Sequence, residues 1–190
     1  MATERHIPAF KRDKRAFLNA VLGHELASTE ATARRFGISR SFLSLEEFIM
    51  EPLDIVSVCT PPATHASLVE AAIRAGKHVL VEKPMTLTSD EGRSLEALAN
   101  STRVILCPAH NFLFSRSLER AKSLLESGRA GKVHWAVGLQ LSSSRRRLPT
   151  WFNDLPGGLF FDEAPHFLYL MRYFLGEMQV EQAWHTSGRT

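Results

Sequence analysis

Two short stretches of this sequence concentrate side chains that could carry out chemistry. The first is Glu82-Lys83-Pro84, which directly follows the apolar run Val79-Leu80-Val81. A lysine at the carboxyl end of a buried strand packs poorly, yet ligands of open α/β sheets bind just outside the carboxyl ends of the strands. The second stretch lies much later in the chain and contains Asp162 and His166. Lys83, Asp162 and His166 are therefore our candidates for catalysis.

The chemistry that suits this set is proton handling at a carbon that bears a hydroxyl group. An ammonium group at Lys83 can polarise the oxygen, and the proline that follows favours an extended backbone at the lysine. Asp162 and His166 stand four residues apart at the start of a predicted helix, so they share one face. A histidine can take the hydroxyl proton, while the carboxylate orients the imidazole or holds a second hydroxyl. The alternatives are a solvated surface lysine and a helix-capping carboxylate beside an unrelated histidine.

The composition of the chain is that of an ordinary globular domain. Its 190 residues fit one domain, or one domain and part of a second. The net charge of +3 arises from 23 basic and 20 acidic residues spread along the sequence, which predicts neither a nucleic-acid nor a membrane partner. No apolar run approaches the roughly 20 residues that span a bilayer, and no signal peptide is apparent. We expect a cytoplasmic location, with Cys59 and Cys107 as buried reduced thiols rather than a disulfide or a metal site.

The elements that must position the candidate residues follow from the hydrophobic pattern. The first part of the chain alternates short apolar runs with segments of helical periodicity. Strands are predicted at 16–22, 53–59, 78–81 and 103–107, and helices at 28–36, 63–75 and 89–100. Repeating β-α units of this length imply parallel strands joined by right-handed crossovers. We therefore predict an α/β fold with a doubly wound parallel sheet of the Rossmann type.

The second part of the chain has a different pattern. Helices are predicted at 117–127 and from about 162 to 174. Residues 132–143 alternate apolar and polar side chains, which is typical of a half-buried antiparallel strand, and residues 180–186 predict another strand. This pattern indicates the start of an α+β substrate domain with an open, mainly antiparallel sheet.

The change of pattern near Cys107 divides the chain into domains 1–107 and 108–190. A doubly wound dinucleotide domain normally begins with a strand and a glycine-rich turn, whose backbone amides hold the pyrophosphate. No G-x-G-x-x-G pattern occurs in the sequence. We therefore expect a chain truncated at both ends, with a first domain that lacks its first strand and glycine-rich turn. On its own, such a chain should bind a dinucleotide weakly or not at all.

Several stretches stand out by their order and spacing. The stronger ones are Cys59-Thr60-Pro61-Pro62-Ala63-Thr64-His65, then Gly76-Lys77-His78-Val79-Leu80-Val81-Glu82-Lys83-Pro84, and then Gly157-Gly158 followed by Asp162, His166 and Gly176. Weaker ones are Ala109-His110-Asn111-Phe112 and Gly128-Arg129-Ala130-Gly131-Lys132-Val133. Over nearly the whole chain, this ordered set resembles the glucose–fructose oxidoreductase / inositol 2-dehydrogenase (Gfo/Idh/MocA) family.

The resemblance implies an oxidoreductase that uses NAD or NADP and transfers hydride between the nicotinamide and a sugar-like or cyclitol-like hydroxyl carbon. It assigns Lys83, Asp162 and His166 to catalysis and implies a cis peptide bond before Pro84. It also implies a homo-oligomer, formed in the complete protein through the open second sheet, and no metal ion. We expect cofactor contacts from Thr60, Pro61, His65, Glu82, Lys83 and His24, and substrate contacts from Asn111, Trp151, Asp162 and His166.

Two features leave the details open. The family pattern is D-x-G-x-H, whereas this sequence has Ala164 and Pro165 directly before His166. Proline is tolerated in a first helical turn, so the helix is still expected.

The second strand of a dinucleotide fold usually ends in an acidic residue that binds the ribose hydroxyls. This region reads Val21-Leu22-Gly23-His24-Glu25. A glycine and a histidine at that position would leave room for the 2′-phosphate of NADP, whereas a shifted register would place the glutamate there and favour NAD.

Two other functions remain open from the sequence. Some members of the superfamily use bound NAD in glycoside cleavage, and the same three candidate residues would serve that elimination. Release of sugar without net consumption of NAD would distinguish this activity from a dehydrogenase. Alternatively, the chain is a non-catalytic sensor or a truncated product, which the lack of a glycine-rich turn favours.

Overall fold

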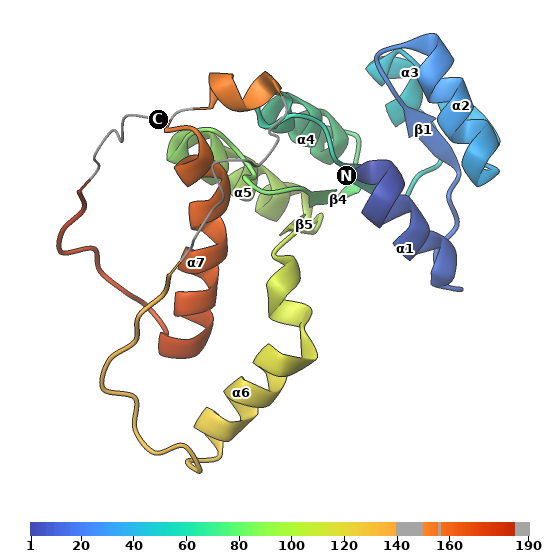
Figure 1. The fold of residues 1–190 in the computed structure, drawn as a ribbon. Coiled ribbons are helices and arrows are strands. Elements are labelled where there is room, and N and C mark those ends of the chain that lie inside the picture. Colours follow the sequence, from blue (N-terminus) through green and yellow to red (C-terminus); the bar gives the residue numbers. More distant parts are fainter. Residues whose placement is uncertain (140–149, 156, 185–190) are drawn as a thin grey trace. The chain divides into compact units, whose positions relative to one another are not determined.

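The computed structural model describes residues 1–139, 150–155 and 157–184, and it divides into two compact units, Met1–Ala109 and His110–Thr190 (Figure 1). The helical elements of the first unit are η1 (Ala2–His6), α1 (Ile7–Arg12), α2 (Leu26–Phe36), α3 (Leu45–Ile49), η2 (Pro62–Thr64), α4 (His65–Arg74) and α5 (Ser89–Thr102). Its strands are β1 (Ala20–Leu22), β2 (Arg40–Phe42), β3 (Ile55–Val58), β4 (His78–Val81) and β5 (Leu106–Pro108).

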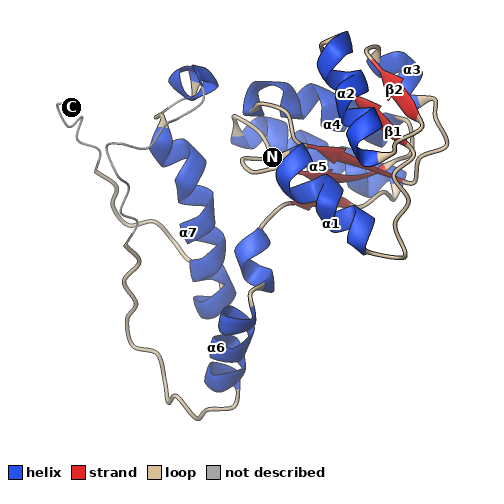
Figure 2. Ribbon diagram, turned by 45° about the vertical axis from the view of Figure 1, so that its right-hand side comes forward, coloured by secondary structure: helices blue, strands red, loops and turns tan. Residues whose placement is uncertain are grey.

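Every paired strand of the first unit runs parallel to its neighbour. β1 pairs with β2, and β4 lies between β3 and β5. Helices follow the strands in the β-α order that the sequence indicates (Figure 2). The prediction of an α/β fold with a parallel sheet is therefore confirmed, and β4 has its predicted bounds, although β1, β3 and β5 are shorter than the apolar runs that predicted them.

The core of the first unit lies on one face of β3 and β4. Alternate residues of these strands are buried there: Val56, Val58, Val79 and Val81. Helix α4 covers this face with Val69 and Ile73, which have no exposed surface. Burial of one such side chain stabilises the fold by roughly 1.5–3 kcal/mol. Because the pleat alternates, the residues between these valines, such as Ser57, point to the other face.

Local signals in the sequence explain where the helices begin and end. Helix α5 starts with a capping box, in which Glu91 N–H donates to Thr88 Oγ1 and Thr88 N–H donates to the Glu91 carboxylate. It ends at Arg103, whose φ of 60° lies in the left-handed region. Helix α2 ends at Gly37, also left-handed, as expected for a glycine that follows a helix.

The two sheets of the first unit are not joined by backbone hydrogen bonds among the described residues. In β1 the backbone of Val21 and Gly23 faces β2, since Gly23 N–H donates to Phe42 O at 3.0 Å. Hydrogen-bonding direction alternates along a parallel strand. The N–H and C=O groups of Ala20 and Leu22 therefore point to the opposite edge of β1, away from β2.

The same argument applies to β3. The carbonyls of Asp54 and Val58 accept bonds from His78 and Glu82 beside β4, both at 2.9 Å. The backbone groups of Ser57 consequently point to the other edge of β3. In the doubly wound order 3-2-1-4-5-6, β2-β1 corresponds to positions 3-2 and β3-β4-β5 to positions 4-5-6. The two unpaired edges thus flank the position of strand 1.

The N-terminal segments η1 and α1 bridge the two sheets through side chains. Ile7 is buried in a small cluster that includes Val21 of β1. The preceding residue, His6, is hydrogen-bonded through Nδ1 to Ser57 Oγ of β3 at 2.9 Å. The end of η1 and the start of α1 therefore contact both sheets on the same face.

The second unit contains η3 (Asn111–Phe114), α6 (Arg116–Glu126), η4 (Thr150–Asp154) and α7 (Leu159–Leu175). Ser115 caps α6, accepting the Leu118 N–H, as a serine at this position is expected to do. Helix α7 follows Gly158, with φ of 55°, and ends at Gly176, with φ of 83°. Lys122 Nζ donates to Tyr173 O at 2.6 Å and so connects α6 to α7.

The predicted antiparallel strands of the second unit are not found in its described residues. Residues 132–139 and 180–184 form no strand, and 140–143 and 185–186 lie outside the described residues. A strand needs a paired edge for its backbone groups, and no described segment of this unit supplies one. The apolar positions of the period-two pattern are consequently exposed, with 79% exposure at Trp135 and 82% at Trp184.

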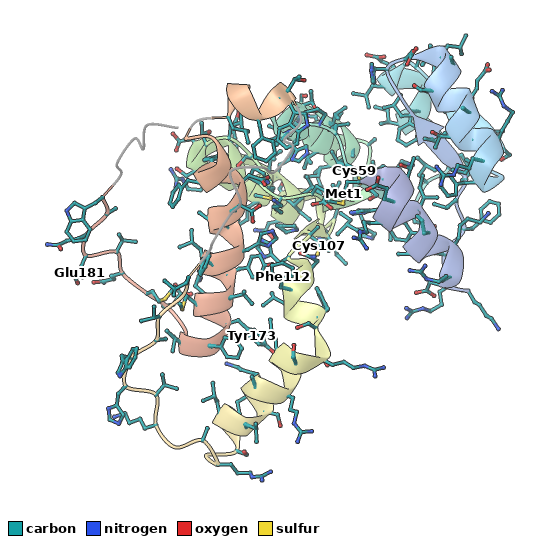
Figure 3. All side chains as sticks on the ribbon, in the orientation of Figure 1. Met1, Cys59, Cys107, Phe112, Tyr173 and Glu181 are labelled. Atoms are coloured by element: carbon teal, nitrogen blue, oxygen red, sulfur yellow. The ribbon has the colours of Figure 1, made fainter. Side chains whose placement is uncertain are left out.

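The cysteines differ from the prediction of two buried thiols. Both are free and are labelled in Figure 3. Cys107 is exposed, however, and Cys59 is only half-buried. Cys59 follows Val58 with its side chain on the Ser57 face, where its Sγ lies 3.6 Å from Ser57 Oγ. Burial was predicted because their runs are apolar, but alternation places these two residues on the face opposite the core.

Candidate functional site

The first part of the candidate site lies where β4 ends. Glu82 N–H still donates to Val58 O, so the ladder extends one residue past the strand. Lys83 follows, half-buried, and the Lys83–Pro84 peptide bond is cis, as the resemblance implies. The ordered strand therefore places the lysine at the carboxyl edge of the sheet, where ligands of this architecture bind.

A histidine from the N-terminal helix contacts the residue before the lysine. His6 Nε2 lies 2.8 Å from Glu82 Oε1, and the two side chains are 11% and 15% exposed. The Cys59 thiol group and the Glu82 carboxylate beside the ring raise the pKa of His6 to about 9. Burial opposes ionisation of Glu82, but the hydrogen bond and charge of His6, with smaller contributions from Lys83, hold the pKa of Glu82 below its ordinary value. At neutral pH this contact is an ion pair.

His65, an expected cofactor contact, holds two backbone segments together. It has no exposed surface. Its Nδ1 lies 2.8 Å from Pro84 O and its Nε2 lies 2.8 Å from Thr60 O. The ring therefore links the turn after β3 to the turn after β4, and both nitrogens are engaged by carbonyl oxygens.

The other expected cofactor contacts lie at strand ends. Thr60 and Pro61 are exposed after β3, and Thr64 Oγ1 donates to Thr60 Oγ1 at 2.7 Å. His24 is exposed between β1 and α2. Just before it, a Cβ at Gly23 would lie 1.9 Å from the Thr29 hydroxyl, so the close approach of α2 requires glycine there.

The second part of the candidate site lies on α7. Asp162 and His166 are 4% and 8% exposed, and their spacing places both on one helix face. The prediction that Pro165 lies in the first turn is wrong, because α7 begins at Leu159 and carries the proline in its interior. Pro165 lacks the N–H that would donate to Phe161 O, yet the helix continues to Leu175.

Aromatic rings surround His166 within the second unit. Its Nδ1 lies 2.7 Å from Tyr169 Oη. Phe112, labelled in Figure 3, stacks on the imidazole with ring centroids 4.5 Å apart. His110 stacks on Tyr169 at 4.2 Å, and burial together with the charge of His166 lowers the pKa of His110. These contacts fix both the plane and the tilt of the catalytic candidate.

The expected substrate contacts on 3₁₀ turns are less enclosed. Asn111 is the first residue of η3 and is exposed. Trp151 is half-buried in η4, and its ring lies 4.5 Å from that of Phe152, which is buried.

The structure thus gathers the candidates into two groups. Thr60, His65, Glu82 and Lys83 meet at the carboxyl edge of the first unit, and Asp162 and His166 share a face of the second. Sequence reasoning missed His6, because no local pattern predicts a contact across 76 positions. Tyr169 could have been found, since it lies three residues after His166 on one helix face.

Metal and membrane signals were also sought in the described part of the chain. It contains no group of three His, Cys, Asp or Glu side chains that could hold a metal ion. None of its helices combines the length and the apolar character needed to cross a membrane.

Comparison with known proteins gives matches over both units. Residues 1–110 match the family GFO_IDH_MocA, described as an oxidoreductase family with an NAD-binding Rossmann fold. Residues 118–189 match the GFO/IDH/MocA C-terminal domain.

Individual relatives agree with these matches. The chain is 32% identical over 170 residues to 1-carboxy-3-chloro-3,4-dihydroxycyclohexa-1,5-diene dehydrogenase of Comamonas testosteroni. This alignment covers 87% of this chain and 43% of that protein. It is 33% identical over 152 residues to myo-inositol 2-dehydrogenase of Thermotoga maritima, covering 79% of this chain and 44% of that protein. The structure of GenD2 from gentamicin A biosynthesis, in complex with NAD, superposes with a TM-score of 0.77 at 30% identity, covering 90% and 50% of the two chains.

The chain spans about half the length of the relatives it matches. Within that span, the order of the motifs, the parallel strands and the lysine after β4 agree with the two family matches. The chain belongs to the Gfo/Idh/MocA family of oxidoreductases, whose first domain is an NAD-binding Rossmann fold.

Proposed function

We propose that the complete protein is an NAD- or NADP-dependent oxidoreductase that acts on a hydroxyl-bearing carbon of a sugar-like or cyclitol-like small molecule. The observation that carries this proposal is Lys83 at the carboxyl edge of the sheet, after β4 and before a cis proline, in a chain of this family. The nicotinamide, when bound, exchanges hydride with that carbon.

The residues of this chain handle the substrate oxygen and its proton. Lys83 polarises the oxygen, and the ion pair of Glu82 with His6 keeps the preceding carboxylate turned away from solvent. Asp162 orients the substrate, and His166 contacts the hydroxyl group whose proton is exchanged. Asn111 and Trp151 contact the more distant hydroxyl groups.

The proposed cofactor contacts of the first unit lie where its strands end. Thr60 and Pro61 are exposed at the carboxyl end of β3 and suit the ribose and nicotinamide, with His65 positioning Thr60 from behind. His24 lies exposed after β1, where the adenosine ribose of this architecture is held, so it suits either NAD or NADP. The described residues include no glycine-rich turn for the pyrophosphate.

The decisive experiment is calorimetric titration of NADH and NADPH into three proteins. They are this chain, an extended chain with an apolar strand and a G-x-G-x-x-G turn before Met1, and the same extension with its turn glycines replaced by alanine. We expect the extended chain to bind at least about tenfold more tightly than either control, because the turn amides hold the pyrophosphate. If none of the three binds, the dinucleotide function is wrong, and the non-catalytic sensor replaces it.

Substrate class is tested next with the extended chain that binds. Cyclitols and sugars are supplied with the oxidised cofactor, and formation of the reduced nicotinamide is followed by absorbance. Replacing Lys83 with methionine should lower kcat by about 100-fold or more while cofactor binding persists. Oligomeric state, expected to be a homo-oligomer in the complete protein, is measured by sedimentation.

A further inference from the structure

The hydroxyl of Tyr169 has two hydrogen-bond partners among the described residues. One is His166 Nδ1, at 2.7 Å, and the other is the backbone N–H of Phe112, at 3.4 Å. Tyr169 is 8% exposed, and all of these groups belong to the second unit. Phe112, labelled in Figure 3, stacks on the His166 ring of α7.

The directions of these two bonds follow from what each group can do. The Phe112 N–H can only donate, so the Tyr169 oxygen accepts from it. The Tyr169 O–H then needs an acceptor, and His166 Nδ1 is the acceptor in contact. In the reverse arrangement, Nδ1–H would donate to the same oxygen and leave a buried O–H without an acceptor. A buried unpaired donor is disfavoured by about tenfold or more.

The surroundings support the same direction. Burial raises the pKa of Tyr169 above its ordinary value, so the hydroxyl keeps its proton at neutral pH. Phe112 holds the plane of the imidazole by stacking, with an interplanar angle of 28°. The ring of His166 therefore cannot turn to exchange its two nitrogens without losing both contacts.

We propose that Tyr169 is a positioning residue that sets the neutral tautomer of His166, with the proton on Nε2. Only the use made of this tautomer rests on the proposed function. In neutral His166 the hydrogen-bond donor is then Nε2, because Nδ1 accepts from Tyr169. This suits a carbonyl oxygen in the direction of reduction.

The tautomer also limits where the proton goes in the opposite direction. Oxidation of the alcohol gives hydride to the bound nicotinamide and the hydroxyl proton to a base. A neutral imidazole whose Nε2 already carries a proton does not take it, so His166 is not the base in this direction. From the sequence, His166 was expected to take the hydroxyl proton. The Tyr169 contact instead makes His166 the group that holds the oxygen in place.

The tautomer is measured directly by NMR on the full chain labelled with ¹⁵N in its histidine rings. Long-range proton–nitrogen correlations show which ring nitrogen carries the proton, and a His166→Gln variant assigns the signal. Tyr169→Phe removes the donating hydroxyl. Tyr173→Phe, on the same helix, is the matched control, since its ring faces Lys122 and no hydrogen bond to its hydroxyl is found among the described residues.

We expect the Nε2–H tautomer to dominate by about tenfold in the wild type and in Tyr173→Phe, and its excess to fall by about three- to tenfold in Tyr169→Phe. A wild type with the proton mainly on Nδ1 overturns the proposal, as does a Tyr169→Phe ratio equal to the wild type. If Tyr169→Phe does not fold, the wild-type spectrum alone decides. No cofactor or substrate is present, so failure of dinucleotide binding and failure of this inference are separate results.

Discussion

The carboxylate that precedes Lys83 depends on a residue from the first helical turn of the chain. His6 binds Glu82 and Ser57 at once, and so connects the turn after β4 to the middle of β3. Its high pKa also excludes a different function, because an imidazolium between a serine and a glutamate cannot act as the general base of a hydrolytic triad at neutral pH. The contact positions the strand end rather than activating Ser57.

The ion pair predicts how stability depends on pH. The pKa of His6 is raised from 6.5 to about 9, so its contribution is fully present below about pH 6.5 and is lost as the pH rises through about 9. The pKa of Glu82 is lowered, so its contribution is lost as the pH falls below its ordinary range. Between pH 6.5 and 9.5 the free energy of unfolding should fall by at most about 3 kcal/mol.

Urea unfolding of the wild type and His6→Gln across this range checks the prediction. The variant should be less stable at pH 6.5 and should approach the wild type at pH 9.5. Parallel pH profiles for the two proteins would show that His6 is not the titrating group.

His65 predicts a second effect at the residue scale. Replacing it with alanine removes the ring's contacts with two carbonyl oxygens and leaves a cavity beneath Thr60 and Pro84, so the free energy of unfolding should fall by about 2–5 kcal/mol. His24→Ala, at an exposed position, is the control and should change it by less than about 0.5 kcal/mol. Similar thermal midpoints for the two variants would contradict a structural role for His65.

Helix α7 carries a proline in its interior, where proline destabilises an α-helix most. Pro165 lies in the interior, whereas Pro8 of α1 lies in a first turn, where proline is tolerated. Pro165→Ala should therefore stabilise the second unit by about 1–3 kcal/mol, and Pro8→Ala should change little. Circular dichroism during thermal unfolding measures both, and equal effects would mean that packing around α7 compensates for the missing N–H.

Elements were predictable from the sequence where their stabilising partners are local. The buried run before Lys83 predicts β4, and the helix from Ser89 follows from its capping box, since both signals lie within a few residues. The pattern at 132–143 predicted a strand that its described residues do not form, because pairing depends on an edge elsewhere. The end of α7 was predicted to within one residue, but its start was missed because the helix begins upstream of Asp162.

The residues of the candidate site also differ in how far the sequence predicts them. Lys83, Asp162 and His166 could be proposed from residue type and spacing alone. The contacts that His6 and Tyr169 make with the candidate site were not predicted. The His6 contact joins positions far apart in the sequence, and periodicity does not predict which side chains hydrogen-bond to each other.

For the first unit as a whole, the two separate sheets predict unequal local stability. β4 is paired on both sides, and Val79 and Val81 are buried. β1 and β2 form a two-stranded pair, an arrangement that is marginal by itself. Hydrogen exchange followed by mass spectrometry should find the amides of β4 exchanging about 100-fold or more slowly than those of β1. Equal rates would show that the unit opens as one cooperative body.

The facing edges of β1 and β3 have a practical consequence for protein engineering. The N-terminal segments η1 and α1 already contact both sheets, so a single added strand could pair with both edges. The first unit could then serve as the acceptor half of a split reporter. A short peptide with an apolar strand and a glycine-rich turn, fused to any protein of interest, would act as the donor half, and increased fluorescence of bound NADH would signal that the two halves had met.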